Sequence, residues 1–137
     1  MDVQLAAVCD FASVTENGKL NILGVFDKVL SPGTPCVHES LFYVARISMS
    51  AGDPDRVAFE LRIVDADGQL ATPPVGVETQ RHEAPQDGEP QTVQLALQIL
   101  RAEFRDFGAY TFELRGNGRH LRDTVLQVVQ AQASPPG

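Results

Sequence analysis

The chain has 137 residues, of which 43% are hydrophobic and 21% are charged, a balance that suits one globular domain with a sizeable core. The formal net charge is −7 and the basic residues are scattered, so the chain lacks the clustered Lys and Arg that nucleic-acid binding requires. No segment approaches the roughly 20 apolar residues that span a bilayer, and we therefore expect no membrane partner.

The first third of the chain predicts a β-hairpin. Apolar and polar side chains alternate in residues 3–10, which is typical of a half-buried strand. Asn17-Gly18 follows, and this pair accepts positive φ at both central positions of a type I′ turn. Residues 20–30 carry apolar side chains on both faces, so we expect a central strand buried on both sides, or a bulge at Gly24 that switches the register. Two prolines within residues 31–35 end this strand.

The middle of the chain predicts three more strands. Residues 57–64 alternate clearly, with apolar side chains inward and polar ones outward. Residues 41–49 place apolar side chains inward and Arg46 and Ser48 outward, and a short strand is expected at residues 75–80. Asp67-Gly68 has the residue types of a hairpin turn. Residues 83–90 are polar and contain Pro and Gly, which predicts a surface loop.

The segment at residues 91–107 fits two patterns. Its apolar residues recur at the spacing of a helix face, and they also alternate as in a strand from Val93 to Ile99. We favour a strand up to about Leu100 followed by a turn, because strands are predicted before and after it. A helix is the alternative.

The last part predicts two strands, at residues 109–115 and within residues 120–129, joined by a turn at Gly116-Asn117-Gly118. Short strands at near-regular spacing, with Gly-rich turns, indicate an all-β fold. We predict a single-domain antiparallel β-sandwich of about seven to eight strands over residues 1–130. Residues 131–137 have little to bury, so we expect a disordered C-terminal tail.

Four segments carry a resemblance to known sequences. They are residues 2–6, Gly18 to Asp27 (GKLNILGVFD), Pro35-Cys36-Val37-His38, and residues 107–114. Through them the chain resembles a family of small bacterial proteins of unknown function, over nearly its whole length. The resemblance implies a small β-sandwich and no activity or catalytic residue. Turn formation and burial explain each residue from Gly18 to Asp27, so we expect this signature to report the fold.

Cys36 and His38 are the candidate ligand-binding residues. A thiol near an imidazole can act as a nucleophile with its base. Side chains two apart on an extended segment diverge from a shared substrate, however, and no third orienting group is evident. An inert loop thiol and a hydrogen-bonded loop histidine are the preferred interpretation. Cys9 and Cys36 are expected to be free thiols, as in a reducing compartment.

Two groups of side chains invite a metal-site interpretation, and we predict that neither binds a metal. The groups are the turn residues Asp53, Asp55, Asp65 and Asp67, and the histidines His38, His82 and His120. A predicted strand separates the two pairs of aspartates by ~25 Å, so we interpret them as turn residues. The histidines lack metal-ligand spacing, and we predict no cofactor.

Phe42 and Val44 are apolar residues predicted on the outward face of their strand. Either both faces of the strand are covered, or this face binds a partner or a second copy of the chain. The leading hypothesis is a non-enzymatic binding or assembly module that acts through a sheet edge or this face. A small hydrolase or ligand-binding module that uses His38 and Cys36 is the alternative, and a calcium or lipid binder is a weaker one.

Two further features bear on where the protein acts. The first five residues lack the basic region and the apolar run of a signal peptide, so we expect a cytoplasmic protein. Arg outnumbers Lys, and Ala, Gly and Pro are plentiful, which indicates a bacterial source with a GC-rich genome.

Overall fold

The computed structural model describes residues 1–80 and 91–132, and all regular structure within them is β-strand. The bounds of the nine strands found there are β1 Asp2–Val14, β2 Leu20–Val25, β3 Lys28–Ser31, β4 Cys36–Met49, β5 Arg56–Val64, β6 Val75–Gln80, β7 Gln91–Phe104, β8 Gly108–Gly116 and β9 Arg119–Gln130. The prediction of an all-β protein is confirmed. The predicted loop at residues 83–90, and the predicted tail beyond residue 132, lie outside the described residues.

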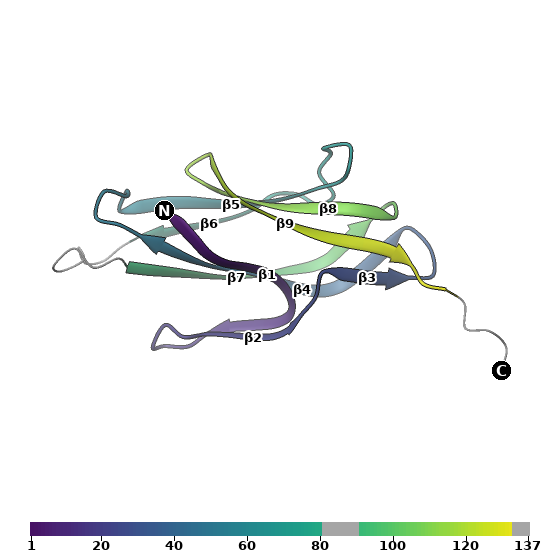
Figure 1. Cartoon of the computed structure of the whole chain (residues 1–137), viewed down its shortest axis with the longest axis horizontal. Helices are drawn as coiled ribbons and strands as arrows, with labels where there is room; N and C mark the ends of the chain where they lie inside the picture. The colour runs from purple at the N-terminus through teal and green to yellow at the C-terminus, as the bar shows by residue number, and fades with distance from the viewer. Residues whose placement is uncertain (81–90, 133–137) are drawn as a thin grey trace.

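The strands form two sheets that lie face to face (Figure 1). One sheet has the order β2-β1-β4-β7, and the other has the order β3-β9-β8-β5-β6. Neighbouring strands are antiparallel except β3 and β9, which run parallel. The predicted sandwich therefore needs two corrections. The described residues hold nine strands, and one of their pairs is parallel.

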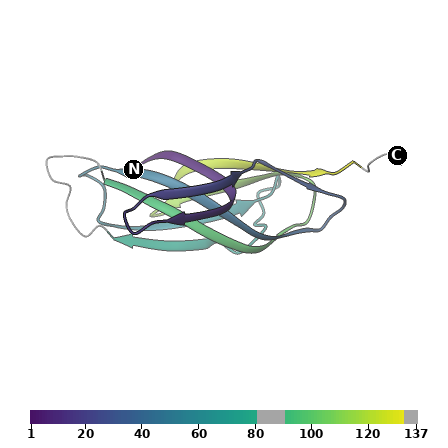
Figure 2. The ribbon, with the colours of Figure 1, turned by 90° about the horizontal axis from the view of Figure 1, so that it is seen from below.

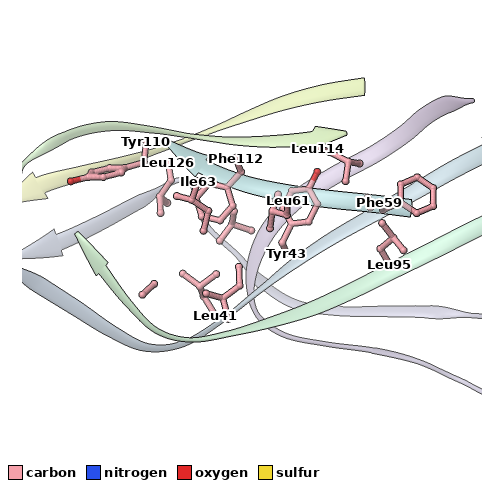
Figure 3. Close-up of a cluster of buried hydrophobic side chains, with 14 of the residues drawn as sticks. Leu41, Tyr43, Phe59, Leu61, Ile63, Leu95, Tyr110, Phe112, Leu114 and Leu126 are labelled. Atoms are coloured by element: carbon pink, nitrogen blue, oxygen red, sulfur yellow. The ribbon is translucent and has the colours of Figure 1, made fainter. Parts of the chain in front are cut away.

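The core lies between the two sheets (Figure 3). All four side chains predicted to point inward from β5 are buried, namely Val57, Phe59, Leu61 and Ile63. Tyr43 of β4 points toward them from the opposite sheet, and its ring stacks on Phe112 of β8 at a centroid distance of 6.2 Å. Because burying a large apolar side chain stabilises the fold by about 1.5–3 kcal/mol, this layer is the main source of stability.

β1 bends so that its second half no longer lies beside β4 in the four-stranded sheet (Figures 1 and 2). It pairs with β4 as far as Cys9 and Phe42, and from there it continues in a hairpin with β2. Both views place this hairpin outside the sheet, across β4 and β7. Ala12 of the hairpin belongs to the same buried cluster as Val44 of β4, and the Gln94 side chain of β7 donates a hydrogen bond to the Gly18 carbonyl. The hairpin therefore covers part of the outer face of the sheet.

The prediction of one central strand at residues 20–30 is wrong. β2 ends at Val25, and β3 begins at Lys28 in the other sheet. The Phe26 amide still donates to the Val8 carbonyl at 3.0 Å, whereas the Asp27 carbonyl already accepts from Gln127 of β9 at 2.9 Å. The chain thus crosses from one sheet to the other within two residues, which explains the additional strand.

The predicted Asn17-Gly18 hairpin is confirmed, but its turn is not type I′. Only Gly18 has a positive φ, of 77°, and the Thr15 amide donates to the Lys19 carbonyl at 2.9 Å across a loop of three residues. This geometry is the next most common hairpin connection. The type I′ pattern occurs instead between β8 and β9, where Asn117 and Gly118 have φ values of 50° and 78°.

The segment at residues 91–107 is a strand that is longer than predicted. β7 pairs with β4 along its whole length, from Met49 opposite Gln91 to Cys36 opposite Phe104. The helical alternative fails because this long partner satisfies the backbone, and tertiary context overrides helix propensity. Arg101 interrupts the regular geometry with a φ of 55°, close to where we expected the turn.

Candidate functional site

A groove of about 440 Å³ opens where the chain crosses between the sheets. It is formed by the bend of β1, the end of β2, the strand β3 and the start of β4. The residues that line it are Asp10, Gly24, Val25, Phe26, Lys28, Val29, Leu30, Cys36, Val37 and His38. Most of them belong to the GKLNILGVFD signature or to the Pro35-Cys36-Val37-His38 segment. Two of the four segments that carry the family resemblance therefore meet at one place in the fold.

Unpaired strand edges border the groove. Since β1 pairs with β4 only as far as Phe42, residues 36–41 of β4 have β7 on one side and, within the described chain, no strand on the other. β3 is likewise the outer strand of its sheet, with β9 as its neighbour. The groove thus lies at a place where each sheet presents backbone N–H and C=O groups at its edge.

Aliphatic side chains form the rim of the groove. Val25 and Leu30 are each 65% exposed and Val37 is 44% exposed. Leu23, nearby in β2, is 68% exposed. The prediction that this stretch is buried on both faces is therefore wrong, because β2 lies at the edge of the hairpin outside the sandwich. Burial in the core does not explain why these exposed positions are apolar. The GKLNILGVFD signature therefore cannot be explained by the fold alone.

The structure brings Cys36 and His38 to this groove together with Asp10. Both predicted residues lie in β4 rather than in a loop, and both are half-buried. The His38 ring packs against Phe26 at a centroid distance of 5.6 Å and an interplanar angle of 32°. In the part of the chain that the structure describes, neither side chain makes a hydrogen bond, so the predicted hydrogen-bonded histidine is wrong. The thiol and imidazole share a surface, and no hydrogen bond joins them among the described residues.

Asp10 lies close against Gly24 at the bottom of the hairpin. A Cβ atom at Gly24 would lie 2.4 Å from the Asp10 Oδ2 atom, and Gly24 has a φ of 70°. Glycine is therefore required twice, for the left-handed backbone and for the close approach of the carboxylate. The bulge at Gly24 that the sequence offers as an alternative is not observed, because the β1–β2 register runs through this point without a shift.

Phe42 and Val44 do not form an open face. Val44 is completely buried beneath the β1–β2 hairpin, and Phe42 is half-buried with its ring edge-to-face against Phe11 at 5.3 Å. The prediction that Val44 belongs to an exposed interaction face is therefore wrong. Instead, both faces of β4 are covered at this point.

The turn aspartates have structural partners. Asp65 accepts hydrogen bonds from the amides of Asp67 and Gln69, each at 2.9 Å. Asp53 accepts bonds from the Met1 amino group at 2.9 Å and from the Ser50 amide at 2.8 Å, and these bonds hold the pKa of its carboxyl below the ordinary value. Among the described residues no group of side chains could hold a metal ion, and His82 lies outside them.

The two cysteines have different environments. Cys9 is completely buried, and burial raises the pKa of its thiol. Cys36 is half-buried at the groove. Both are free thiols, so a thiol reagent will reach Cys36 first.

A second groove, of about 540 Å³, lies on the outer face of the five-stranded sheet, away from the first. Its charged lining residues are Glu60, Glu78 and Arg115. Glu60 pairs with Arg62 at 3.4 Å and Arg115 approaches Glu113 at 4.0 Å. These pairs follow the alternating charges of a solvated sheet face, and the groove holds none of the sequence-predicted site residues.

Comparison with known proteins places the chain among proteins without an assigned activity. A family model described as "Family of unknown function (DUF6941)" matches residues 4–129. No curated protein and no solved structure matches the chain. The described residues contain no helix that could serve as a membrane span.

Proposed function

The chain belongs to this family of unknown function, and we propose that it is a non-enzymatic binding module that holds an extended segment of a protein partner in the groove. The observation that carries the proposal is the unpaired edge of β4 at residues 36–41, beside exposed aliphatic side chains. Such an edge is matched by a ligand with regularly spaced backbone donors and acceptors, which is a polypeptide strand.

The incoming strand occupies the position that β1 vacates when it bends away. Its backbone pairs with β4, in continuation of the pairing that β1 makes up to Phe42. Alternate apolar side chains of the partner contact Val25, Leu30 and Val37, which supply specificity. The groove carries one carboxylate and one ammonium group, Asp10 and Lys28, whose formal charges cancel, so apolar contacts rather than net charge select the partner.

The supporting features agree with a cytoplasmic location, which forms part of the proposal. Both cysteines are free thiols, as expected in a reducing compartment. The module needs no cofactor, because strand addition uses only backbone groups and apolar contacts. Self-association is a separate possibility with its own surface.

Selection from a library of random linear peptides displayed on phage tests the proposal. The protein serves as bait, and enriched peptides are then titrated by fluorescence anisotropy against wild type, Val37→Asp and Val125→Asp. The two valines are matched, because Val125 lies on β9 outside the groove and is 46% exposed against 44% for Val37. We expect Val37→Asp to weaken binding at least about tenfold, and Val125→Asp to change it less than about twofold.

Two results would overturn the proposal. One is that the enriched peptides bind Val37→Asp and wild type equally well. The other is that selection with Val37→Asp as counter-bait removes every enriched sequence, which would show that the peptides bind outside the groove. Circular dichroism melting of both variants shows whether each is folded under the binding conditions.

The second candidate is a hydrolase or ligand-binding site that uses Cys36 and His38, and their presence in one groove with Asp10 favours it. It requires His38 to activate the Cys36 thiol. Alkylation of Cys36 by iodoacetamide at neutral pH distinguishes the candidates, since Cys9 is buried. If the protein is a binding module, Cys36 is alkylated at the same rate in wild type and in His38→Ala. If His38 activates the thiol, the alkylation rate falls at least about tenfold in His38→Ala.

A further inference from the structure

The outer edge of β7 is unlike the other strand edges of the described chain. β7 has 14 residues, whereas the other outer strands, β2, β3 and β6, have 6, 4 and 6. Residues 91–100 of β7 contain no charged residue and no proline. Natural sheets protect long edges with charges, prolines or bulges, and a long edge without them pairs with another strand.

The side chains of β7 leave this edge incompletely buried. Val93 and Leu97 point toward the core but are only half-buried, as are Val75 and Val77 of β6, the outer strand of the other sheet. On the outer face, Gln98 donates a hydrogen bond to the Ser40 hydroxyl at 3.2 Å, and Gln94 bonds the Gly18 carbonyl. Both amides are directed back onto their own sheet, so they do not cover the β7 backbone.

We propose that two copies of this chain associate through β7, antiparallel about a two-fold axis, and join their four-stranded sheets into one. The sequence of β7 is complementary to itself in one register centred on Ala96. That register sets Leu95 opposite Leu97, Gln94 opposite Gln98, Val93 opposite Ile99 and Thr92 opposite Leu100. Each pair lies on one face of the sheet, as antiparallel pairing requires, and Arg101 and Glu103 remain outside the uncharged segment.

A second copy fits this edge better than an unrelated strand. A two-fold contact uses the same segment twice, and a segment without charge meets itself without repulsion. The net charge of −7 on each copy opposes association at long range. Added salt screens this repulsion, so dimerisation will strengthen with ionic strength.

Sedimentation velocity on the full chain tests the proposal with a charge exchange at Thr92 and Leu100, which are both exposed. T92K/L100K sets Lys opposite Lys twice in the proposed register, and T92K/L100E sets Lys opposite Glu twice. We expect wild type and T92K/L100E to dimerise, and T92K/L100K to dissociate at least about tenfold more readily than T92K/L100E. General charge repulsion predicts the reverse, because the two lysines reduce the net negative charge.

Three outcomes would overturn the dimer. They are a monomeric wild type at millimolar concentration and high salt, equal dissociation of the two double variants, and open-ended oligomers instead of dimers. Open-ended growth would mean that β7 of one copy enters the groove of the next. Val37→Asp distinguishes the dimer from the groove function. We expect it to weaken peptide binding in the groove and to leave dimerisation through β7 unchanged. Thermal melting of each variant confirms that it is folded.

Discussion

β5 and β2 are both rich in apolar residues and have opposite environments. β5 alternates, and every inward side chain of it is buried, whereas β2 carries apolar residues on both faces. In β2, Leu23 is 68% exposed and Val25 is 65% exposed. β5 lies between β8 and β6 beneath the opposite sheet, whereas β2 is the outer strand of a hairpin folded against the outside. An alternating pattern identifies side chains that share a face, and the rest of the fold decides whether that face is covered.

The difference matters for function. Side chains that the core does not use contribute little to stability, so a ligand can bury them at little cost to the fold. The exposed aliphatic residues at the end of β2 lie beside the groove, next to a strand edge without a partner. Four sets of substitutions test this contrast between the packed core and the exposed hairpin.

Phe59→Ala in β5 should have the largest effect. Its side chain is almost completely buried between the sheets, and removing it leaves a cavity. We expect the free energy of unfolding to fall by about 3–5 kcal/mol, measured by urea denaturation. A loss below about 1 kcal/mol would show that β5 does not lie in a packed core.

Gly24→Ala comes next, with an expected loss of about 2 kcal/mol from the left-handed backbone and the contact with Asp10. Gly18→Ala is the control, because Gly18 also has a positive φ, of 77°, but has no atom within 4 Å of an added Cβ. We expect the control to lose about 1 kcal/mol. In the variant Gly24→Ala/Asp10→Ala, the loss of unfolding free energy should fall to that of the control. A loss as large as that of Gly24→Ala alone would show that the contact with Asp10 does not cause it.

The two tyrosines of the core differ in the hydrogen bonding of their hydroxyl groups. Tyr110 donates a hydrogen bond to the Asp106 carbonyl at 2.7 Å, whereas the buried Tyr43 hydroxyl approaches Thr124 without meeting hydrogen-bond geometry. Burial also raises the pKa of Tyr43 above its usual range. We expect Tyr110→Phe to cost about 1 kcal/mol and Tyr43→Phe to be neutral or stabilising in thermal and urea melts. A larger loss of stability for Tyr43→Phe than for Tyr110→Phe would mean that the Tyr43 hydroxyl makes a hydrogen bond in solution.

Leu23→Ser should have the smallest effect on stability. Its side chain is largely in solvent, so we expect a change of less than about 0.5 kcal/mol in the same urea experiment. A loss comparable with that of Phe59→Ala would mean that β2 is covered in solution, and the contrast with β5 would then be lost.

Local patterns in the sequence predicted the strands whose partners bury them. The inward residues of β5 and the positions of the glycine turns were correct, because alternation and turn chemistry depend on neighbouring residues, although the turn at Asn17-Gly18 is of another type. The split at Phe26 and the bend of β1 could not be predicted, because they depend on pairing with residues far along the chain, such as Gln127.

The same limit applies to the candidate site. The sequence offers Cys36 and His38 as candidate residues, and the structure places both in one groove. Asp10 was missed, because only the bend of β1 brings it to them. The exposed apolar residues of the signature were misinterpreted as core, since composition does not distinguish a covered face from an open one. The sequence held one signal of this: the short strand has more apolar residues than burial of a single face requires.

Amide hydrogen exchange at residues 36–41 of β4 tests the binding proposal most directly. NMR follows these amides in the isolated protein and in the presence of a saturating enriched peptide, with β8 as the internal reference. We predict that the amides facing the groove exchange at least about tenfold more slowly when the peptide is bound, and that β8 is unchanged. Bound peptide without any added protection at residues 36–41 would contradict strand addition at this edge.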